Sequence, residues 1–169
     1  MTADDRPVER RVGETLRDRG DTVAVAESCT GGLVGSLLTD VSGSSAYFDR
    51  SVVTYSYDAK QDVLAVSREA LDDHGAVSEP VAIEMARAVR DTAGTDWGVA
   101  TTGVAGPTGG SPETPVGTVY IAVAHAAPWE TGQSGCTVRH YEFAGSRTEV
   151  KAKIAGQALE DLLDRTHTQ

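Results

Sequence analysis

Three adjacent side chains of this sequence can each attack a carbonyl carbon: Ser28, Cys29 and Thr30. They follow residues 23–26, where alternating valine and alanine are typical of a buried strand. Gly31 and Gly32 interrupt the apolar run, and leucine and valine then return at helical spacing over residues 33–38. The sequence therefore predicts that groups able to act as nucleophiles lie at a turn between a strand and a helix.

Such a turn is compatible with acyl-transfer chemistry at Ser28, although a helix cap is the commoner role for a serine or threonine at this position. The free N–H groups at the start of the following helix would point toward the same space, where they could stabilise the oxyanion of a tetrahedral intermediate. The glycines at 31–32 let a ligand approach the backbone closely. Two alternatives stand beside this hypothesis. Ser28 or Thr30 could simply cap the helix, or Cys29 could attack as a thiolate whose pKa is lowered by the helix N-terminus.

A serine hydroxyl needs a base before it becomes a good nucleophile, and Lys60 is the candidate base. It follows an expected strand in a chain that has only three lysines. A lysine in a partly dry site loses its proton readily. Tyr55 could hydrogen-bond to the serine oxygen or position the amine. Spacing alone also fits a solvated lysine beside a half-buried strand tyrosine.

A second glycine-rich segment, "TTGVAGPTGGSPETPVGT" at 101–118, follows another apolar strand. It lacks the ending of a Walker A motif and the spacing of a dinucleotide-binding fingerprint. A long turn is the simple interpretation. Two glycine-rich turns after two buried strands nevertheless favour one ligand crevice at the edge of a sheet. The four histidines and two cysteines fit no metal-ligand spacing, so no metal and no cofactor are expected.

The elements that would position these groups alternate between strands and helices. Helices are expected at 8–20, 31–39, 67–73, 78–94 and 146–165. Strands are expected at 22–27, 52–55, 96–106 (where the strand runs into glycines), 117–125 and 136–144. The last two strands are consecutive, so the sheet should be mixed. The expectation is a single three-layer α/β/α domain over residues 1–169, with its core at about 8–165.

Composition narrows the functional class. The formal charge of −10 argues against a nucleic-acid-binding surface, and no apolar run is long enough to span a bilayer. The first eleven residues lack a signal-peptide pattern, so a cytoplasmic location is expected. Lysine is rare whereas arginine and aspartate are frequent, which favours adaptation to a salty cytoplasm over an ordinary acidic enzyme. A homo-oligomer is also expected.

Taken together, the segments resemble the CinA C-terminal domain family, the nicotinamide-nucleotide amidohydrolases. The matching pieces are "AESCTGG" at 26–32, "SSAYFDRSVVTYSYDAK" at 44–60, "HGAVSE" at 74–79, "TTGVAGPTGG" at 101–110 and "PVGTVYIAVA" at 115–124. They occur in the family's order, and together they are far more specific than either glycine segment alone. Thr108 departs from the pattern, because a glycine is common there. Many relatives also carry a preceding molybdopterin-binding-like domain with pyrophosphatase activity, for which 169 residues leave no room.

The resemblance implies a metal-free serine hydrolase that converts nicotinamide mononucleotide to nicotinic acid mononucleotide and ammonia. Ser28 matches the family's nucleophile, and Tyr55 and Lys60 match its tyrosine and lysine. Lys60 would take the Ser28 proton directly or through Tyr55. Substrate contacts are expected from eight further residues: Cys29, Thr30, Gly31, Gly32, Thr102, Gly103, Gly106 and Arg147.

Alternatives remain within this resemblance. Arg147 suits a phosphate geometrically, although it could instead pair with surface carboxylates. The substrate could be another small amide. The domain could also bind a pyridine nucleotide without turning it over, as a regulatory module.

Overall fold

The computed structural model describes residues 4–169. Residues 1–3 of the expected 1–169 domain, which also begin the stretch expected to lack a signal peptide, lie outside the described part. Within it the elements run in the order α1 (Val8–Arg19), β1 (Val23–Glu27), α2 (Leu33–Thr39), the short 3-10 helix η1 (Ser44–Ala46), β2 (Phe48–Val53), α3 (Tyr57–Leu64), α4 (Arg68–His74), α5 (Glu79–Ala93), β3 (Trp97–Gly103), β4 (Thr118–His125), β5 (Gly135–Glu142) and α6 (Arg147–His167).

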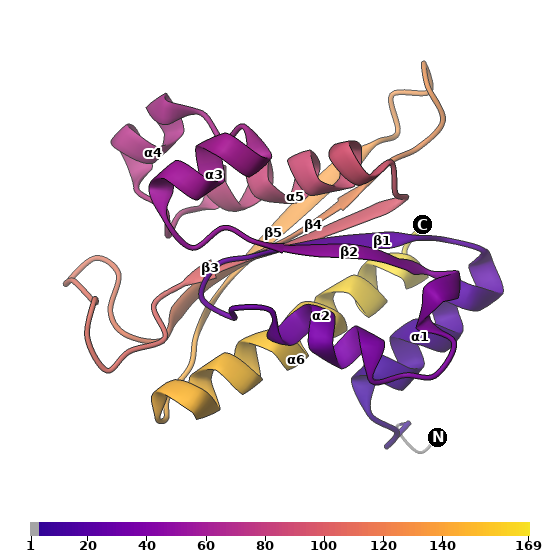
Figure 1. Ribbon diagram of the computed structural model, residues 1–169, viewed down its shortest axis with the longest axis horizontal. Coiled ribbons are helices and arrows are strands. Elements are labelled where there is room, and N and C mark those ends of the chain that lie inside the picture. Colours follow the sequence, from indigo (N-terminus) through magenta and orange to yellow (C-terminus); the bar gives the residue numbers. More distant parts are fainter. Residues whose placement is uncertain (1–3) are drawn as a thin grey trace.

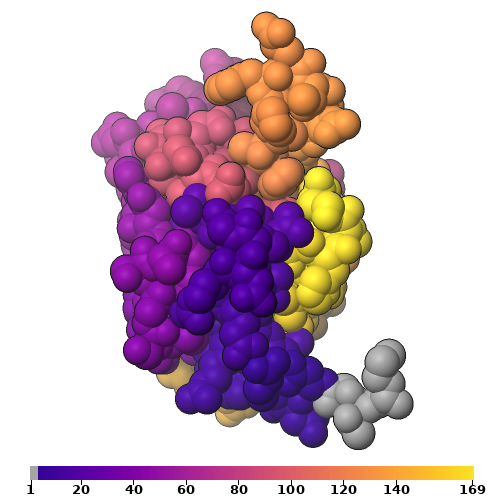
Figure 2. Space-filling model, turned by 90° about the vertical axis from the view of Figure 1, so that its right-hand side faces the viewer, coloured from indigo at the N-terminus to yellow at the C-terminus, as the bar shows by residue number. Residues whose placement is uncertain are grey.

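The strands form one mixed sheet in the order β2-β1-β3-β4-β5. β1 pairs in parallel with both β2 and β3, whereas β3, β4 and β5 pair antiparallel. Figure 1 shows α1, α2 and α6 on one face of the sheet and α3, α4 and α5 on the other. Figure 2 shows α1, in indigo, lying beside the C-terminal end of α6, in yellow. The predicted three-layer α/β/α domain with a mixed sheet is confirmed.

Both faces of the central strand β1 are covered, and its sequence reflects this. Val23 and Val25 belong to the core beneath α1, α2 and α6, whereas Ala24 and Ala26 belong to the core beneath α5. Small residues on the second face let α5 approach the sheet closely. A Cβ atom added at Gly98 would lie 2.2 Å from a backbone oxygen of α5. Because β1 and β3 are parallel, the turns after both strands open at the same edge of the sheet.

Helix α3 is the one α-helix of the described chain that the sequence interpretation missed. The β-branched residues before it favoured a strand ending at 55, but β2 ends at Val53. Ser56 then caps α3 by accepting a hydrogen bond from the backbone N–H of Ala59. Lys60 therefore lies on a helix, not at the end of a strand. In residues 4–169 no helix is both long and apolar enough to span a bilayer.

Candidate active site

Ser28 is the first residue after β1, and the sheet fixes its backbone. Its N–H donates to the carbonyl oxygen of Thr101 on β3 over 3.0 Å, and the residue is 7% exposed. Gly31 and Gly32 then adopt positive φ angles of 60° and 104°, which turn the chain into α2. The N-cap residue of α2 is Gly32, which has no side chain with which to cap the helix. Neither Ser28 nor Thr30 is thus the simple N-cap that was the alternative interpretation.

Lys60 reaches Ser28 directly. The Lys60 amine lies 2.8 Å from Ser28 Oγ, 2.7 Å from the carbonyl oxygen of Thr54 and 3.3 Å from that of Tyr55. A neutral amine has two N–H donors and one lone pair. When the two carbonyls accept the two donors, the lone pair is left for the Ser28 hydroxyl proton.

The surroundings of Lys60 favour this neutral form. Its side chain is fully buried, and burial lowers the pKa of the amine from 10.5 to about 8. Removing an ammonium group from water disfavours its charged state, which explains the direction of the shift. The amine is therefore a usable proton acceptor slightly above neutral pH.

The side chain of Tyr55 lies apart from Ser28 and Lys60, its two predicted catalytic partners. Its side chain is 62% exposed, and its hydroxyl oxygen accepts a hydrogen bond of 3.2 Å from Arg147. Within residues 4–169 no hydrogen bond joins the phenol to Ser28 or Lys60. Only the backbone carbonyl of Tyr55 touches the Lys60 amine. The direct proton path between serine and lysine is hydrogen-bonded, whereas the path through the phenol is not.

A cavity of about 380 Å³ opens over Ser28. Five of the eight predicted substrate-contact residues line it: Cys29, Thr102, Gly103, Gly106 and Arg147. The other three, Thr30, Gly31 and Gly32, lie in the turn beneath Ser28 and do not line the cavity. The Thr102 hydroxyl donates to the carbonyl oxygen of Ala76 over 2.7 Å, so its proton is already engaged.

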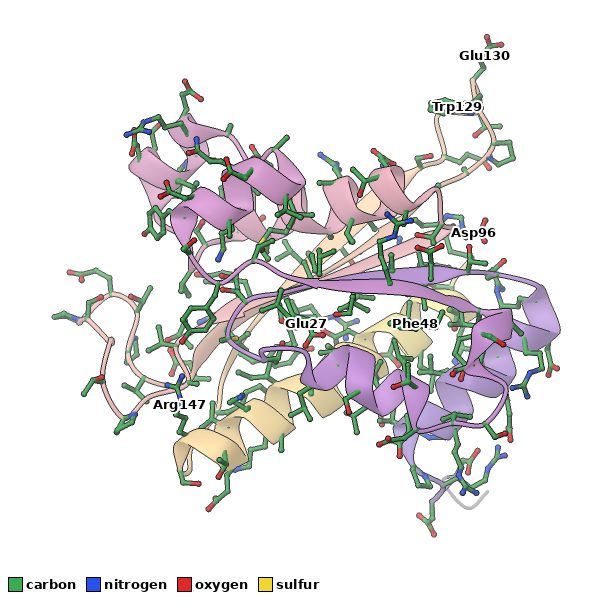
Figure 3. All side chains as sticks on the ribbon, in the orientation of Figure 1. Glu27, Phe48, Asp96, Trp129, Glu130 and Arg147 are labelled. Carbon is green, nitrogen blue, oxygen red and sulfur yellow. The ribbon has the colours of Figure 1, made fainter. Side chains whose placement is uncertain are left out.

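Arg147 closes one side of the cavity from the first turn of α6, close to the loop that follows β3 (Figure 3). Its guanidinium donates to the carbonyl oxygen of Gly106 over 2.6 Å as well as to Tyr55. No carboxylate in the described chain lies within ion-pair distance of it. Gly106 itself has a φ of 85°, and an added Cβ would lie 2.4 Å from Val116. The loop therefore depends on glycine at this position.

Residues 74–77 form one wall of the cavity, which the sequence did not predict. His74, expected to be a surface or structural residue, lines the cavity together with Gly75, Ala76 and Val77. This segment is fastened on both sides, because the N–H of Ala76 donates to the Tyr57 hydroxyl oxygen over 3.2 Å and its carbonyl accepts from Thr102. The available signal was the "HGAVSE" segment, which matched the family without having an assigned role.

The amides at the start of α2 are not free, contrary to the expectation that they face the substrate. The N–H groups of Gly32, Val34 and Gly35 all donate to the buried carboxylate of Glu27, over 3.2, 2.9 and 3.0 Å. The N–H of Gly31 donates to the carbonyl oxygen of Ser28 over 3.2 Å. In the described residues this leaves the amides of Cys29 and Thr30 without an acceptor. These two are the candidates to face an oxyanion.

Cys29 lacks the properties of a nucleophile. Burial raises the pKa of its thiol to about 12, so the thiolate is scarce near neutral pH. Both cysteines of the chain are free thiols. No group of three or more histidine, cysteine, aspartate or glutamate side chains in residues 4–169 could hold a metal ion.

Comparisons with known proteins agree with this architecture. A profile described as the CinA C-terminal domain matches residues 5–166. The nicotinamide-nucleotide amidohydrolase PncC of Escherichia coli K12 is 45% identical over 155 residues, which are 92% of this chain and 90% of that protein. A CinA-like protein of Geobacter sulfurreducens is 46% identical over 97% of this chain, but the match covers only 38% of the relative's length. This chain thus spans little more than a third of the longer relative.

A solved structure shows the same fold. The competence/damage inducible protein CihA from Agrobacterium tumefaciens superposes with a TM-score of 0.87 at 38% sequence identity, over 97% of this chain and 98% of the other. The family match, the sequence identity and the shared fold lead to one conclusion. The chain belongs to the CinA C-terminal domain family.

Proposed function

We propose that this protein is a metal-independent serine amidohydrolase that deamidates nicotinamide mononucleotide in pyridine nucleotide salvage. The products are nicotinic acid mononucleotide and ammonia. The observation that carries the proposal is the buried Lys60 amine 2.8 Å from Ser28 Oγ. The similarity to PncC over 90% of that protein's length supports the choice of substrate.

Acylation starts from neutral Lys60. Its lone pair takes the Ser28 proton while Oγ attacks the carboxamide carbon. The carbonyl oxygen becomes an oxyanion, which the N–H groups of Cys29 and Thr30 stabilise. The lysine ammonium then gives its proton to the amide nitrogen. The amide C–N bond breaks, ammonia leaves, and an ester of nicotinic acid mononucleotide, still carrying its ribose phosphate, remains on Ser28.

Deacylation repeats the same proton transfers with water. Lys60, neutral again, takes a proton from a water molecule as that water attacks the ester carbon. The tetrahedral intermediate collapses, Ser28 Oγ leaves with the proton held by Lys60, and the nicotinate carboxylate is released. One base placed beside one alcohol serves both halves of the reaction.

The lining of the cavity suits an anionic nucleotide. None of its residues is acidic, although the chain as a whole has a formal charge of −10. Arg147 is the phosphate partner, since a guanidinium can bind two phosphate oxygens at once. Thr102 and Gly103, at the end of β3, and Gly106, in the loop that follows, contact the ribose and the phosphate. The Tyr55 phenol then contacts the nucleotide together with Arg147.

The test is ammonia release from nicotinamide mononucleotide by purified protein in molar salt with EDTA present. Ser28→Ala should abolish turnover and leave the fold intact. Ser36→Ala removes an exposed hydroxyl from α2 and is the matched control. Full activity of Ser28→Ala would rule out the nucleophile. Tight binding of pyridine nucleotides without turnover would favour the regulatory module, and release of ammonia only from other amides would favour a different amidase.

The same proposal covers the setting in which the enzyme works. It is a cytoplasmic, salt-adapted homo-oligomer formed by a single catalytic domain over residues 1–169. The acidic surface supports salt adaptation, and two free thiols suit a reducing compartment. Val53, Tyr57 and Val63 are about half exposed, which supports a subunit interface near α3. Light scattering coupled to gel filtration measures the assembly, and a monomer at all salt concentrations would contradict it.

A further inference from the structure

Glu27 is a fully buried carboxylate directly before the proposed nucleophile. It lies between the sheet and α2 (Figure 3). Besides the three backbone amides, its oxygens accept hydrogen bonds from the Thr30 hydroxyl over 2.6 Å and the Ser51 hydroxyl over 2.5 Å. No lysine or arginine in residues 4–169 forms an ion pair with it. Removing a charged carboxylate from water costs free energy when only neutral donors surround it. A buried Glu27 is therefore expected to have a function that offsets this cost.

The surrounding residues are shaped to admit this carboxylate. A Cβ atom added at Gly35 would lie 2.7 Å from the Ser51 Cβ and 3.5 Å from a Glu27 carboxylate oxygen. The helix therefore approaches β2 and the carboxylate at a glycine. Five donors from α2, the turn and β2 converge on one side chain, which a neutral capping residue with a single oxygen could not satisfy.

Thr30 extends this network to β3. It donates its proton to Glu27, so at the 2.8 Å contact between the Thr30 and Thr101 hydroxyls the donor is Thr101. The carbonyl oxygen of the same Thr101 accepts the N–H of Ser28. The turn is thus fastened to β2 through Ser51 and to β3 through Thr101, with Glu27 at the junction.

We propose that Glu27 is the positioning residue of the proposed catalytic machinery. It acts through Ser28 and does not touch the substrate. By binding the amides of Gly32, Val34 and Gly35, it fixes the turn so that Ser28 Oγ faces Lys60. Among the described residues, 4–169, the N–H groups of Cys29 and Thr30 find no acceptor in the same turn. This inference rests on Ser28 being the nucleophile, but not on the identity of the substrate.

A serine-directed probe tests the inference without the proposed substrate. With a small uncharged alkyl fluorophosphonate, Ser28 Oγ forms a bond to phosphorus, the P–F bond breaks, fluoride leaves and Lys60 takes the proton. Mass spectrometry gives both the rate of labelling and the final stoichiometry at Ser28. A positioning defect slows labelling but leaves the end point at one label per chain. A loss of folded protein lowers the end point and leaves the rate unchanged.

Two variants separate positioning from folding. Glu27→Gln keeps the shape but turns an N–H₂ group toward N–H donors, and labelling should slow about 100-fold. Thr30→Val keeps the volume but removes the hydroxyl that donates to Glu27 and accepts from Thr101, and labelling should slow about 10-fold. In turnover assays kcat should fall by the same factors, whereas KM should change little.

Glu84→Gln is the matched control. Glu84 accepts hydrogen bonds from the backbone N–H and the hydroxyl of Ser67 at the start of α4, away from Ser28, and its loss should not slow labelling. If Glu27→Gln and Thr30→Val both label Ser28 at the parent rate, the positioning role is wrong and the nucleophile stands. If the parent protein is labelled elsewhere, the proposed nucleophile is wrong and the positioning role fails with it.

Discussion

The Lys60 amine should control the pH dependence of the reaction. Lys60 must be neutral to accept the Ser28 proton, and burial lowers its pKa to about 8. The active fraction therefore rises with pH: about one tenth of the enzyme at pH 7, one half near pH 8 and about nine tenths at pH 9. At substrate concentrations below KM, kcat/KM should increase roughly tenfold between about pH 7 and about pH 9.

The assay follows ammonia release from nicotinamide mononucleotide at constant ionic strength. The second pKa of a phosphate monoester is about 6, so above about pH 7 the charge of the substrate does not change. Lys60→Arg is the control variant, because a guanidinium stays protonated over this range and cannot act as the base. It should be inactive at every pH tested. The reasoning would be refuted by a kcat/KM that does not change from about pH 7 to about pH 9, or by an increase of kcat/KM with pH that persists in Lys60→Arg.

The same amine links stability to pH, because its pKa is about 8 in the folded protein and 10.5 when the side chain is exposed. Between these two values the unfolded chain binds a proton that the folded protein does not. The free energy of unfolding, measured relative to Lys60→Met, should therefore fall by about 3 kcal/mol as the pH drops from 10.5 to 8, and then stay level. Urea titrations measure this, and a difference that does not change with pH would contradict it. Iodoacetamide should not inactivate the enzyme near neutral pH, because burial raises the pKa of Cys29 to about 12; inactivation with carboxamidomethyl on that thiol would count against the assignment. Gly98→Ala should lower stability by about 3 kcal/mol, since its Cβ would lie 2.2 Å from a carbonyl oxygen of α5, and an unchanged melting temperature would show that the packing is looser. Molar KCl should raise the melting temperature, because it screens the repulsion within a chain of formal charge −10, and a decrease would argue against salt adaptation.

Much of the fold was predictable from local patterns. Three local patterns each gave the right element type: the valine and alanine run before Ser28, the glycine pair after it, and Ser78 with Pro80 at the start of α5. Ser78 occupies the N-cap position of α5, but its hydroxyl donates to the carbonyl oxygen of Gly75 and does not cap the helix. Helix α3 was not predicted because Val52 and Val53 extend the strand pattern up to its first turn. The capping role of Ser56 was visible in the sequence, but such a cap is easily overlooked beside β-branched neighbours.

The site was predictable in part. The family resemblance pointed to Ser28 and Lys60. These residues are 32 positions apart, and no local sequence pattern predicts that their side chains touch. The direction of the Tyr55 phenol depends on Arg147, which lies 92 residues away, so it could not be read from spacing. Glu27 was overlooked because a glutamate after a buried strand looks like the first surface residue. Only the fold shows that five donors surround it.

The central claim is that Ser28, deprotonated by Lys60, forms an ester with the acyl group of the substrate. The most direct measurement mixes excess enzyme with nicotinamide mononucleotide, quenches with acid within one turnover, and locates the acyl group by peptide mass spectrometry. The prediction is an ester of nicotinic acid mononucleotide on Ser28, with the ribose phosphate still attached, that appears together with ammonia and is absent from Ser28→Ala. An acyl group on Cys29, or a full burst of ammonia from Ser28→Ala, would contradict the claim.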